Sequence, residues 1–594
     1  MKKAKWLLVI SLIITLLGVC IGFGVQTVGG KVSIKNIKIA SEDGKTLSAL
    51  LFVPNTATNK TPAPAVIAVH GYVNAKEHMT EYALELARRG YVVLAPDLSG
   101  HGYSERAAED GAMMQQPGAS GGVNYDLMAL YNMPFVDKEN ISLIGHSLGA
   151  FNCQVAEATN PDKVKAMMLL GYCPMFDITS KCNVGVLLSK YDESAHFFIN
   201  GAKTIPEAKD SPNMKKVFNT EDPVVVDKVY GSFKDGTVRQ WFMPSNTHPG
   251  DLFNTQPIAQ TISFLEKSSP APNPIDPYNQ IWKWHQFGTL LTLVGFGIGI
   301  FAVASLLLKT KYFSTLVQAP SKSSGLKGIY WWIAAVVIAA IPGLTFLKFG
   351  NIGSKIVPSK LLPIVYSNIT FTWAVGCAII FLVLFLIWHF ATAKSADDKN
   401  VIAYGLSTSN ENPQFKWGYI GKSLLLAIIT LGIPYILLYI VYNICHLDYR
   451  FIVVMLHPMD FVHFKIFLVY LIPSLIFFFV FSMLANSWFK MKEFTGKKAI
   501  IPYLANALIA VGGLIVLNLI QYITLFQTGA VKWGDAVSLM LAISEWQLIP
   551  LMAFASMIST YFYKKTANIY TGVFTSAALV AWYSICMNAI DILL

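Results

Sequence analysis

The stretch Ile141-Ser-Leu-Ile-Gly-His-Ser-Leu-Gly-Ala150 decides the fold of the first half of the chain. An apolar, strand-like run leads directly into Gly145-His-Ser-Leu-Gly149, which fits the pattern G-x-S-x-G, and a helix-like segment follows. The two glycines allow a turn so tight that the serine projects above the edge of a sheet, with its hydroxyl at the N-terminus of a helix. The pattern therefore predicts that Ser147 is a nucleophile.

Alternating strand-like and helix-like segments surround this motif. Short β-branched runs occur at 65–69, 91–95, 141–144 and 184–188, and helix-like stretches such as 77–89 lie between them. Continuously apolar strands separated by helices are typical of a mostly parallel sheet with helices on both faces. We therefore expect residues 31–268 to form an α/β domain.

The turn after run 65–69 reads His70-Gly71-Tyr72. A nucleophilic serine needs backbone amides that stabilise the developing oxyanion, and the amide that follows the nucleophile is one of them. We assign the oxyanion hole to the amides of Tyr72 and Leu148; the alternative is that His70-Gly71 merely ends a strand. The next glycine-rich turn contains Asp97 and His101, which we interpret as turn-stabilising because the acid and base of this architecture follow the nucleophile.

With these motifs the domain resembles the α/β-hydrolase superfamily, and within it the dienelactone-hydrolase-like and serine-peptidase-like esterases. The motifs that carry the resemblance are His70-Gly71, Asp97-Leu-Ser-Gly-His-Gly-Tyr-Ser104, Phe135-Val-Asp137 and Gly145-His-Ser-Leu-Gly149. The resemblance covers about residues 45 to 267. It implies a triad in the order Ser, Asp, His, with the acid after a later strand and the histidine near the end of the domain.

The sequence offers one candidate for each remaining triad position. Asp192 follows the strand-like run 184–188, at the rim where a parallel sheet carries its catalytic groups, and Glu193 is the alternative. His248 lies in a loop before the final helix, whereas His196 is too close to the acid. The predicted chemistry is acyl transfer: His248 takes the Ser147 proton, Asp192 orients the imidazole, and water resolves the acyl-enzyme. No cofactor and no metal are expected.

The composition of the whole chain excludes a soluble cytosolic enzyme. Of 594 residues, 54% are hydrophobic and only 14% are charged, against roughly a quarter in ordinary soluble domains. Residues 1–30 read as an uncleaved signal anchor, 269–286 as a Pro-rich linker, and 287–594 as a membrane domain. We expect about eight spans there, an all-α polytopic bundle, near 287–308, 328–348, 367–391, 419–442, 464–485, 499–526, 538–562 and 567–592.

The net charge of +11 reflects topology rather than nucleic-acid binding. Many lysines fall in short loops between apolar runs, as positively charged residues do on the cytoplasmic side of a membrane. We therefore place the N-terminus inside and the α/β domain outside the cytoplasm of a cell membrane, with the lipid bilayer as a partner. The preference for lysine over arginine favours a bacterium with AT-rich DNA. The loops expected to be cytoplasmic hold Lys309, Lys311, Lys322, Lys327, Lys394, Lys399, Lys416, Lys490, Lys492, Lys497, Lys498, Lys564 and Lys565.

Three features have open interpretations. The outer loop from His446 to His463 could bind a metal, although residues that merely lie between two spans explain it better, because its spacing fits no metal motif. Glu545 lies within a predicted span, where a carboxylate is costly; it is either functional or paired within the bundle. Cys173 and Cys182 could form a disulfide or stay reduced and buried.

Two functions fit these observations. The first is a membrane-bound serine hydrolase that cleaves an ester, thioester or amide in a small-molecule, lipid or peptide acyl substrate outside the cytoplasm. The second is a transporter or membrane scaffold with a hydrolase-like accessory domain. The complete set Ser147, Asp192 and His248 favours the first, because a domain kept only for binding need not retain all three.

Overall fold

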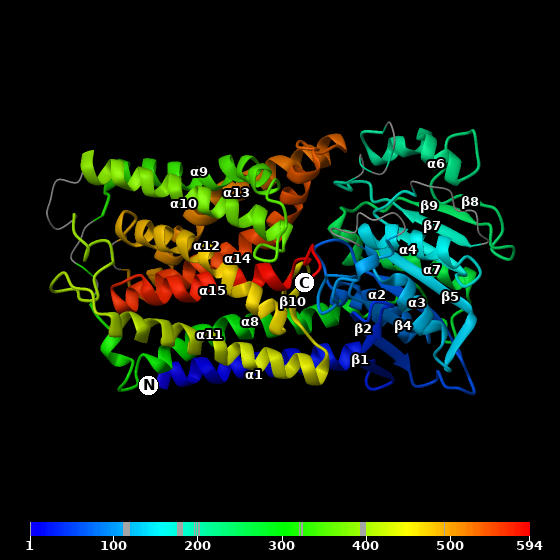
Figure 1. Ribbon diagram of the computed structural model, residues 1–594, viewed down its shortest axis with the longest axis horizontal. Coiled ribbons are helices and arrows are strands. Elements are labelled where there is room, and N and C mark those ends of the chain that lie inside the picture. The colour runs from blue at the N-terminus through cyan, green and yellow to red at the C-terminus, as the bar shows by residue number, and fades with distance from the viewer. Residues whose placement is uncertain are drawn as a thin grey trace.

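The chain, analysed as a computed structural model, has two parts that lie end to end (Figure 1). An α/β domain occupies one end, and long helices that run side by side occupy the other. The N-terminus lies at the far end of the helical part, and the C-terminus lies at the junction (Figure 1). The residues described are 2–110, 119–174, 182–194, 197, 199, 202–319, 321, 325–391, 399–491 and 494–594.

Nine strands in the described part of the chain form one sheet, in the order β1-β2-β4-β3-β5-β6-β7-β9-β8. The six strands from β4 to β9 in that order are parallel, while β1, β2 and β8 pair antiparallel with their neighbours. This arrangement confirms the mostly parallel sheet. The strands are β1 Val32–Ala40, β2 Thr46–Pro54, β3 Ala63–Val69, β4 Val92–Pro96, β5 Val136–His146, β6 Ala166–Leu170, β7 Asn183–Leu187, β8 Val229–Tyr230 and β9 Arg239–Phe242.

Helices cover both faces of the sheet because its central strands are apolar on both sides. In β3, Ile67 and Val69 pack toward α3 and α4, whereas Val66 and Ala68 pack toward α2 and α7. Each fully buried aliphatic side chain contributes about 1.5–3 kcal/mol to folding. The helices of this domain are η1 Lys76–Met79, α2 Thr80–Arg88, η2 Ala108–Asp110, α3 Val123–Tyr131, α4 Leu148–Thr159, η4 Ile205–Asp210, α6 Pro212–Val217, η5 Pro249–Leu252 and α7 Thr255–Ser268.

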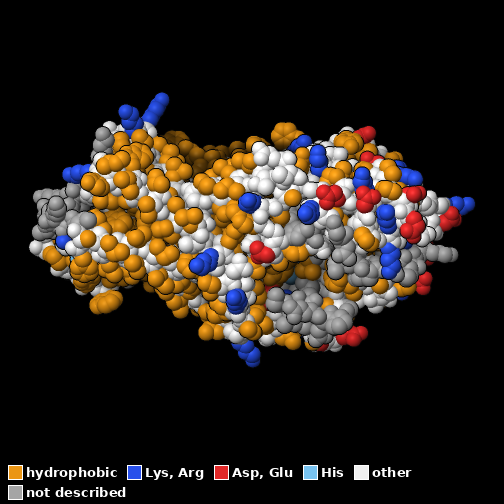
Figure 2. Space-filling model, turned by 90° about the horizontal axis from the view of Figure 1, so that it is seen from above, with side chains coloured by type: hydrophobic (Ala, Val, Ile, Leu, Met, Phe, Trp, Pro, Cys, Tyr) orange, Lys and Arg blue, Asp and Glu red, His pale blue; other side chains and the backbone are white. Residues whose placement is uncertain are grey.

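The other part is a bundle of long apolar helices. Among the described residues, eight helices are long and apolar enough to cross a membrane: α1, α8 to α12, a helix over Gly496–Thr528 that contains α13, and α14. Figure 2 shows hydrophobic side chains gathered over this half and charged side chains over the α/β domain. The helices are α1 Lys2–Gln26, α8 Trp282–Leu307, η6 Ser314–Leu316, α9 Gly328–Gly353, α10 Val365–Ala391, α11 Trp417–Cys445, α12 Phe461–Ser487, η8 Gly496–Ile500, α13 Ile501–Thr528, α14 Ala536–Thr566 and α15 Tyr570–Cys586.

The last helix is shorter than the sequence predicts. We expected a span over 567–592, but α15 has 17 residues and ends at Cys586. The chain leaves the helix because the following segment binds the α/β domain: the Ile590 amide donates to the Gly100 carbonyl at 2.7 Å. The C-terminal segment is thus part of the junction between the two halves.

The loops of the bundle divide between its two ends. At the end away from the α/β domain, Gln318 bonds to the Lys565 carbonyl and Leu326 to the Trp488 carbonyl, which brings three of the lysine-bearing loops together. At the other end, the short hairpin of β10 (Tyr449–Phe451) and β11 (Val454–Leu456) faces the α/β domain. The lysine-rich loops therefore gather at one end of the bundle.

Helix α1 packs along α8 through small residues. The Ser11 hydroxyl donates to the Gly295 carbonyl at 2.7 Å, and a Cβ added at Gly288 would lie 2.5 Å from the Gly22 nitrogen. Such close backbone approach is typical of packing between membrane helices. One face of α1 is thus integrated into the bundle.

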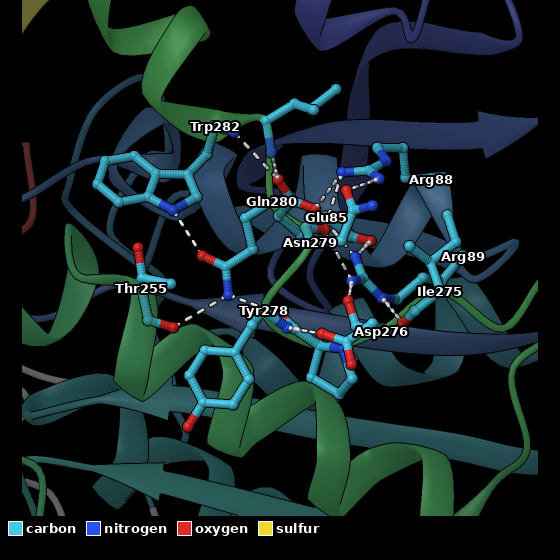
Figure 3. A network of polar contacts seen from close by, with 12 residues as sticks. Glu85, Arg88, Arg89, Thr255, Ile275, Asp276, Tyr278, Asn279, Gln280 and Trp282 are labelled. Atoms are coloured by element: carbon cyan, nitrogen blue, oxygen red, sulfur yellow. Dashed lines mark hydrogen bonds and ion pairs between the residues drawn. The ribbon is translucent and has the colours of Figure 1, made fainter.

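The Pro-rich segment 269–281 is fastened to helix α2 (Figure 3). The buried guanidinium of Arg89 donates to the carbonyls of Ile275, Asp276 and Asn279 at 2.7–3.2 Å. The Glu85 carboxylate accepts from the amides of Ile281 and Trp282, at 2.5 and 3.0 Å, and so caps the start of α8. This connection therefore fixes the entry of the chain into the bundle.

A buried network of charged side chains joins the halves beside η1 and α2. The Glu81 carboxylate lies 3.1 Å from Arg450 and 3.1 Å from His285. The Glu77 carboxylate accepts from the Tyr442 hydroxyl at 2.6 Å and lies 3.4 Å from His457. Burial alone would raise the pKa of Glu77, but Lys76 and His457 outweigh burial and hold it well below its usual range.

Ion pairs account for most of the charged side chains of the loop 446–463. Asp448 pairs with Arg450 at 3.4 Å, and His463 pairs with Asp460 at 2.8 Å. Among the described residues, these side chains meet partners of opposite charge rather than forming a group that could hold a metal ion. The loop thus serves as a docking surface for the α/β domain.

Candidate active site

Ser147 occupies a strained turn between β5 and α4. Its backbone has φ 54° and ψ −117°, a conformation that non-glycine residues rarely adopt. A Cβ at Gly145 would overlap the backbone of residues 149 and 150, and a Cβ at Gly149 would overlap the His70 carbonyl. The two glycines of G-x-S-x-G therefore permit the turn that lifts the serine above the sheet.

The predicted acid and base lie in contact. The imidazole Nδ1 of His248 lies 2.9 Å from Oδ2 of Asp192, and both side chains are buried. The other carboxylate oxygen accepts from the amide and hydroxyl of Ser194, at 2.8 and 2.6 Å. These bonds fix the carboxylate and assign the Nδ1 proton to the Asp192 side, which leaves Nε2 available as a base.

The charges of this pair shift both pKa values. Burial alone would lower the pKa of His248, but the Asp192 carboxylate outweighs burial and raises it to about 9. Burial alone would raise the pKa of Asp192, yet His248 and Ser194 hold it below its ordinary value. The pair is thus arranged to stabilise an imidazolium, which forms when His248 takes a proton from a nucleophile.

One cavity of about 220 Å³ brings the predicted residues together. Ser147, His248 and Tyr72 all line it, and a Cβ at Gly71 would lie 3.2 Å from the Ser147 Cβ. Leu148 is the first residue of α4, so its amide is one of the unpaired donors at a helix N-terminus. The amides assigned to the oxyanion hole therefore flank the nucleophile.

Two further residues of this site were not identified from the sequence. Ser194 lies 3.1 Å from His248 Nδ1 as well as bonding Asp192. His146, the variable residue of G-x-S-x-G, donates from Nε2 to the His248 carbonyl at 3.0 Å, and burial lowers its pKa to about 3. The position of His146 inside the motif was a signal for it; Ser194 carried none.

Glu193, the alternative acid, bonds to the backbone of His248 rather than to its imidazole. Its Oε2 accepts from the His248 amide at 2.7 Å, and its Oε1 accepts from the Tyr522 hydroxyl on α13 at 2.6 Å. Burial and the neighbouring Asp192 raise its pKa to about 7. Glu193 therefore hydrogen-bonds the backbone of His248 and connects it to the bundle.

The bundle also forms a wall of the cavity. Six residues of α14 line it, at the spacing of one helix face. Tyr366 of α10 and Val453 of the hairpin line it too. The α14 residues are Ala536, Leu539, Met540, Ile543, Ser544 and Gln547. The cavity at Ser147 is therefore built from both halves of the chain.

Asp97 stabilises a turn, and Cys173 and Cys182 form no disulfide. Asp97 accepts from the Lys76 ammonium at 2.6 Å and from the Tyr103 amide at 3.0 Å, and so holds the turn that contains His101. Cys173 and Cys182 are both buried and unpaired. His196 lies outside the described residues.

A family model of serine aminopeptidases, type S33, matches residues 60–232. The matched region contains the strained serine turn and Asp192, and the sheet has the order and mostly parallel direction described above. The domain is an α/β hydrolase. The match ends before His248, so the family model does not include the residue that the sequence predicts as the base and the structure pairs with Asp192.

Three solved structures from different organisms are similar to parts of this chain. A hypothetical protein from Pseudomonas aeruginosa is 26% identical over 23% of this chain and 42% of its own, with a TM-score of 0.21. An epoxide hydrolase from Vigna radiata is 21% identical over 25% of this chain and 40% of its own, with a TM-score of 0.19. A Pyrococcus furiosus esterase is 16% identical over 40% of this chain and 92% of its own, with a TM-score of 0.29.

The chain thus covers less than half the length of the first two structures. No curated protein matches the chain.

Proposed function

We propose that this protein is a membrane-bound serine hydrolase that cleaves an ester, thioester or amide bond through an acyl-enzyme. The observation that carries the proposal is that His248, paired with the buried Asp192 at 2.9 Å, lines the same cavity as a serine held in a strained strand-to-helix turn. A domain that only bound ligands would not need this arrangement. The assignment therefore places Ser147 as nucleophile, His248 as base and Asp192 as the orienting acid.

The mechanism follows from this geometry. His248 accepts the Ser147 proton as the hydroxyl oxygen attacks the substrate carbonyl, and Asp192 stabilises the imidazolium that results. The amides of Tyr72 and Leu148 donate to the oxyanion of the tetrahedral intermediate. His248 then gives its proton to the leaving group, and a water molecule, activated by the same imidazole, hydrolyses the acyl-Ser147 ester.

The proposed location is a cell membrane, with the N-terminus in the cytoplasm and the α/β domain outside it. Within the described part of the chain, eight helices are long and apolar enough to span a membrane, and lysine-bearing loops lie at the end of the bundle away from the α/β domain. Retention of lysines on the cytoplasmic side supports this orientation. No nucleic acid enters the proposal.

The proposed substrate is an acyl compound that reaches the active site at the membrane surface. The cavity wall formed by α14 begins with four apolar residues and ends with Ser544 and Gln547, so it presents both apolar and hydrogen-bonding surface. An acyl substrate with a polar end, whether small molecule, lipid or peptide, matches such a wall.

The direct test is covalent labelling by a fluorophosphonate probe on whole cells. Wild-type protein is expected to label, and Ser147→Ala to abolish labelling while expression is unchanged. Ser189→Ala is the matched control, because Ser189 follows β7 in the same domain and hydrogen-bonds Asp251 rather than lining the cavity. Labelling that survives Ser147→Ala would remove the nucleophile assignment.

A further inference from the structure

A second cavity lies at the junction, separate from the one at Ser147. It has a volume of about 480 Å³ and is lined by both halves of the chain and by the C-terminal segment. Lys45 and Arg106 come from the α/β domain, whereas Lys360 and Lys465 come from the loop before α10 and from the first turns of α12. Four basic side chains from separate elements therefore meet around one hollow.

The lining carries an excess of positive charge, although the buried Arg106 guanidinium is held by the Ile590 carbonyl at 2.8 Å and by the nearby Asp591. Glu105 is its one acidic side chain among the described residues, and it pairs with Lys45 at 3.5 Å. Lys360 and Lys465 are both exposed and make no ion pair within the described part of the chain. An anion held between them would gain two charge-assisted contacts without displacing a carboxylate.

An apolar wall runs away from these cations. Val462, Ile466 and Val469 lie on one face of α12, at spacings of four and three residues, and all three line the cavity. They extend about 10 Å along a helix that is long and apolar enough to cross a membrane. The cavity lining thus combines basic groups with a strip of aliphatic side chains along α12.

We propose that this cavity binds an anionic phospholipid, with its phosphate between Lys360 and Lys465 and an acyl chain along the α12 strip. Basic side chains beside membrane helices attract the phosphate of an anionic lipid headgroup through charge-assisted contacts. A free phosphate would use the lysines but leave the apolar strip unfilled. The lipid would bridge the two halves, because the lining comes from both. This proposal rests on the membrane placement above, and not on the hydrolase activity.

The experiment uses the full-length protein in nanodiscs of phosphatidylcholine, with or without phosphatidylglycerol. Wild-type protein is expected to unfold at a higher temperature when phosphatidylglycerol is present, because a ligand of the folded state stabilises it. Native mass spectrometry should show retained phosphatidylglycerol, and K360Q/K465Q should reduce the retained lipid at least fivefold and cancel the thermal shift.

Two further variants separate this site from general surface charge. K355Q is the matched control, because Lys355 is exposed in the same outer loop but does not line the cavity; it should behave as wild type. Val469→Trp narrows the strip without touching the lysines and should also reduce lipid retention. Because this variant keeps all basic residues, it tests the site even if K360Q/K465Q folds poorly.

Three outcomes would overturn the proposal. One is an equal thermal shift in K360Q/K465Q and wild type, which would place the lipid effect elsewhere. Another is an equal loss in K355Q, which would indicate surface charge alone. The third is a shift of the same size with inorganic phosphate in detergent, which would indicate a free-anion site. Fluorophosphonate labelling in the same samples reports separately on the proposed hydrolase.

Discussion

Protonation of His248, the proposed base, sets the pH dependence expected of the proposed reaction. The imidazole must be neutral to accept the Ser147 proton, and Asp192 raises its pKa to about 9. The rate of fluorophosphonate labelling should therefore rise with pH through the alkaline range. In Asp192→Asn this rise in labelling rate should occur at lower pH, because the charge that stabilised the imidazolium is gone. The maximal labelling rate should fall by about 10⁴-fold. A rise at the same pH in Asp192→Asn and wild type would contradict the pairing of His248 with Asp192.

Gly171 is required by the same histidine. It has φ +60°, and a Cβ there would lie 2.6 Å from His248 Nδ1. Gly171→Ala should cost about 1–2 kcal/mol in backbone strain and, in addition, displace the imidazole and slow labelling at least tenfold. Gly44→Ala is the control, because Gly44 has φ +77° but nothing within 4 Å of the added Cβ. Equal labelling in both variants would show that the contact with His248 is unimportant.

At the scale of elements, helix α13 contacts the loop that carries Asp192 and Glu193, in part through the hydroxyl of Tyr522. Tyr522→Phe removes the donor to Glu193 and leaves that carboxylate oxygen unpaired, which costs about 1–3 kcal/mol. Because the lost hydrogen bond lowered the pKa of Glu193, this pKa should rise further above 7, and the pH profile of labelling should change. Tyr442→Phe, which removes the bond to Glu77 elsewhere in the junction, should cost similar stability with an unchanged profile.

Glu193 also predicts a pH-dependent stability. Its pKa is about 7 in the folded protein against a reference value of 4.5, so folding favours its protonated form. The stability from this group is present below pH 4.5 and is lost as pH rises toward 7. Glu193→Gln mimics the protonated form. The difference between its unfolding temperature and that of wild type should therefore grow in favour of the variant as pH rises from 5 to 8. A constant difference over this range would contradict the shift.

At the scale of the whole molecule, the halves are joined by buried charges. Arg450 and Glu81 lie 3.1 Å apart, and both side chains are fully buried. Arg450→Met leaves Glu81 with His285 as its one remaining ionic partner among the described residues and should cost about 3–5 kcal/mol, whereas Arg450→Met combined with Glu81→Met should recover much of this loss. Thermal unfolding of the four proteins in detergent measures the coupling. Additive losses would show that the pair does not act as a unit.

The sequence by itself determined the features that local chemistry fixes. Gly145 and Gly149 around Ser147 predicted the strained turn, and apolar runs such as 65–69 predicted the buried parallel strands. The apolar segments after residue 281 predicted the long helices, since backbone groups in lipid must be paired within each segment. These inferences need only a residue and its near neighbours in the chain.

Only the tertiary structure decided how the two halves meet. The contact of Tyr522 with Glu193 joins residues 329 positions apart, and nothing local to either signals it. The same holds for the α14 wall of the active site and for the basic cavity between Lys360 and Lys465. Such contacts depend on how whole elements pack, and that packing places the active site against the bundle. A bundle that had no evident purpose in the sequence therefore forms part of the cavity in which the proposed reaction takes place.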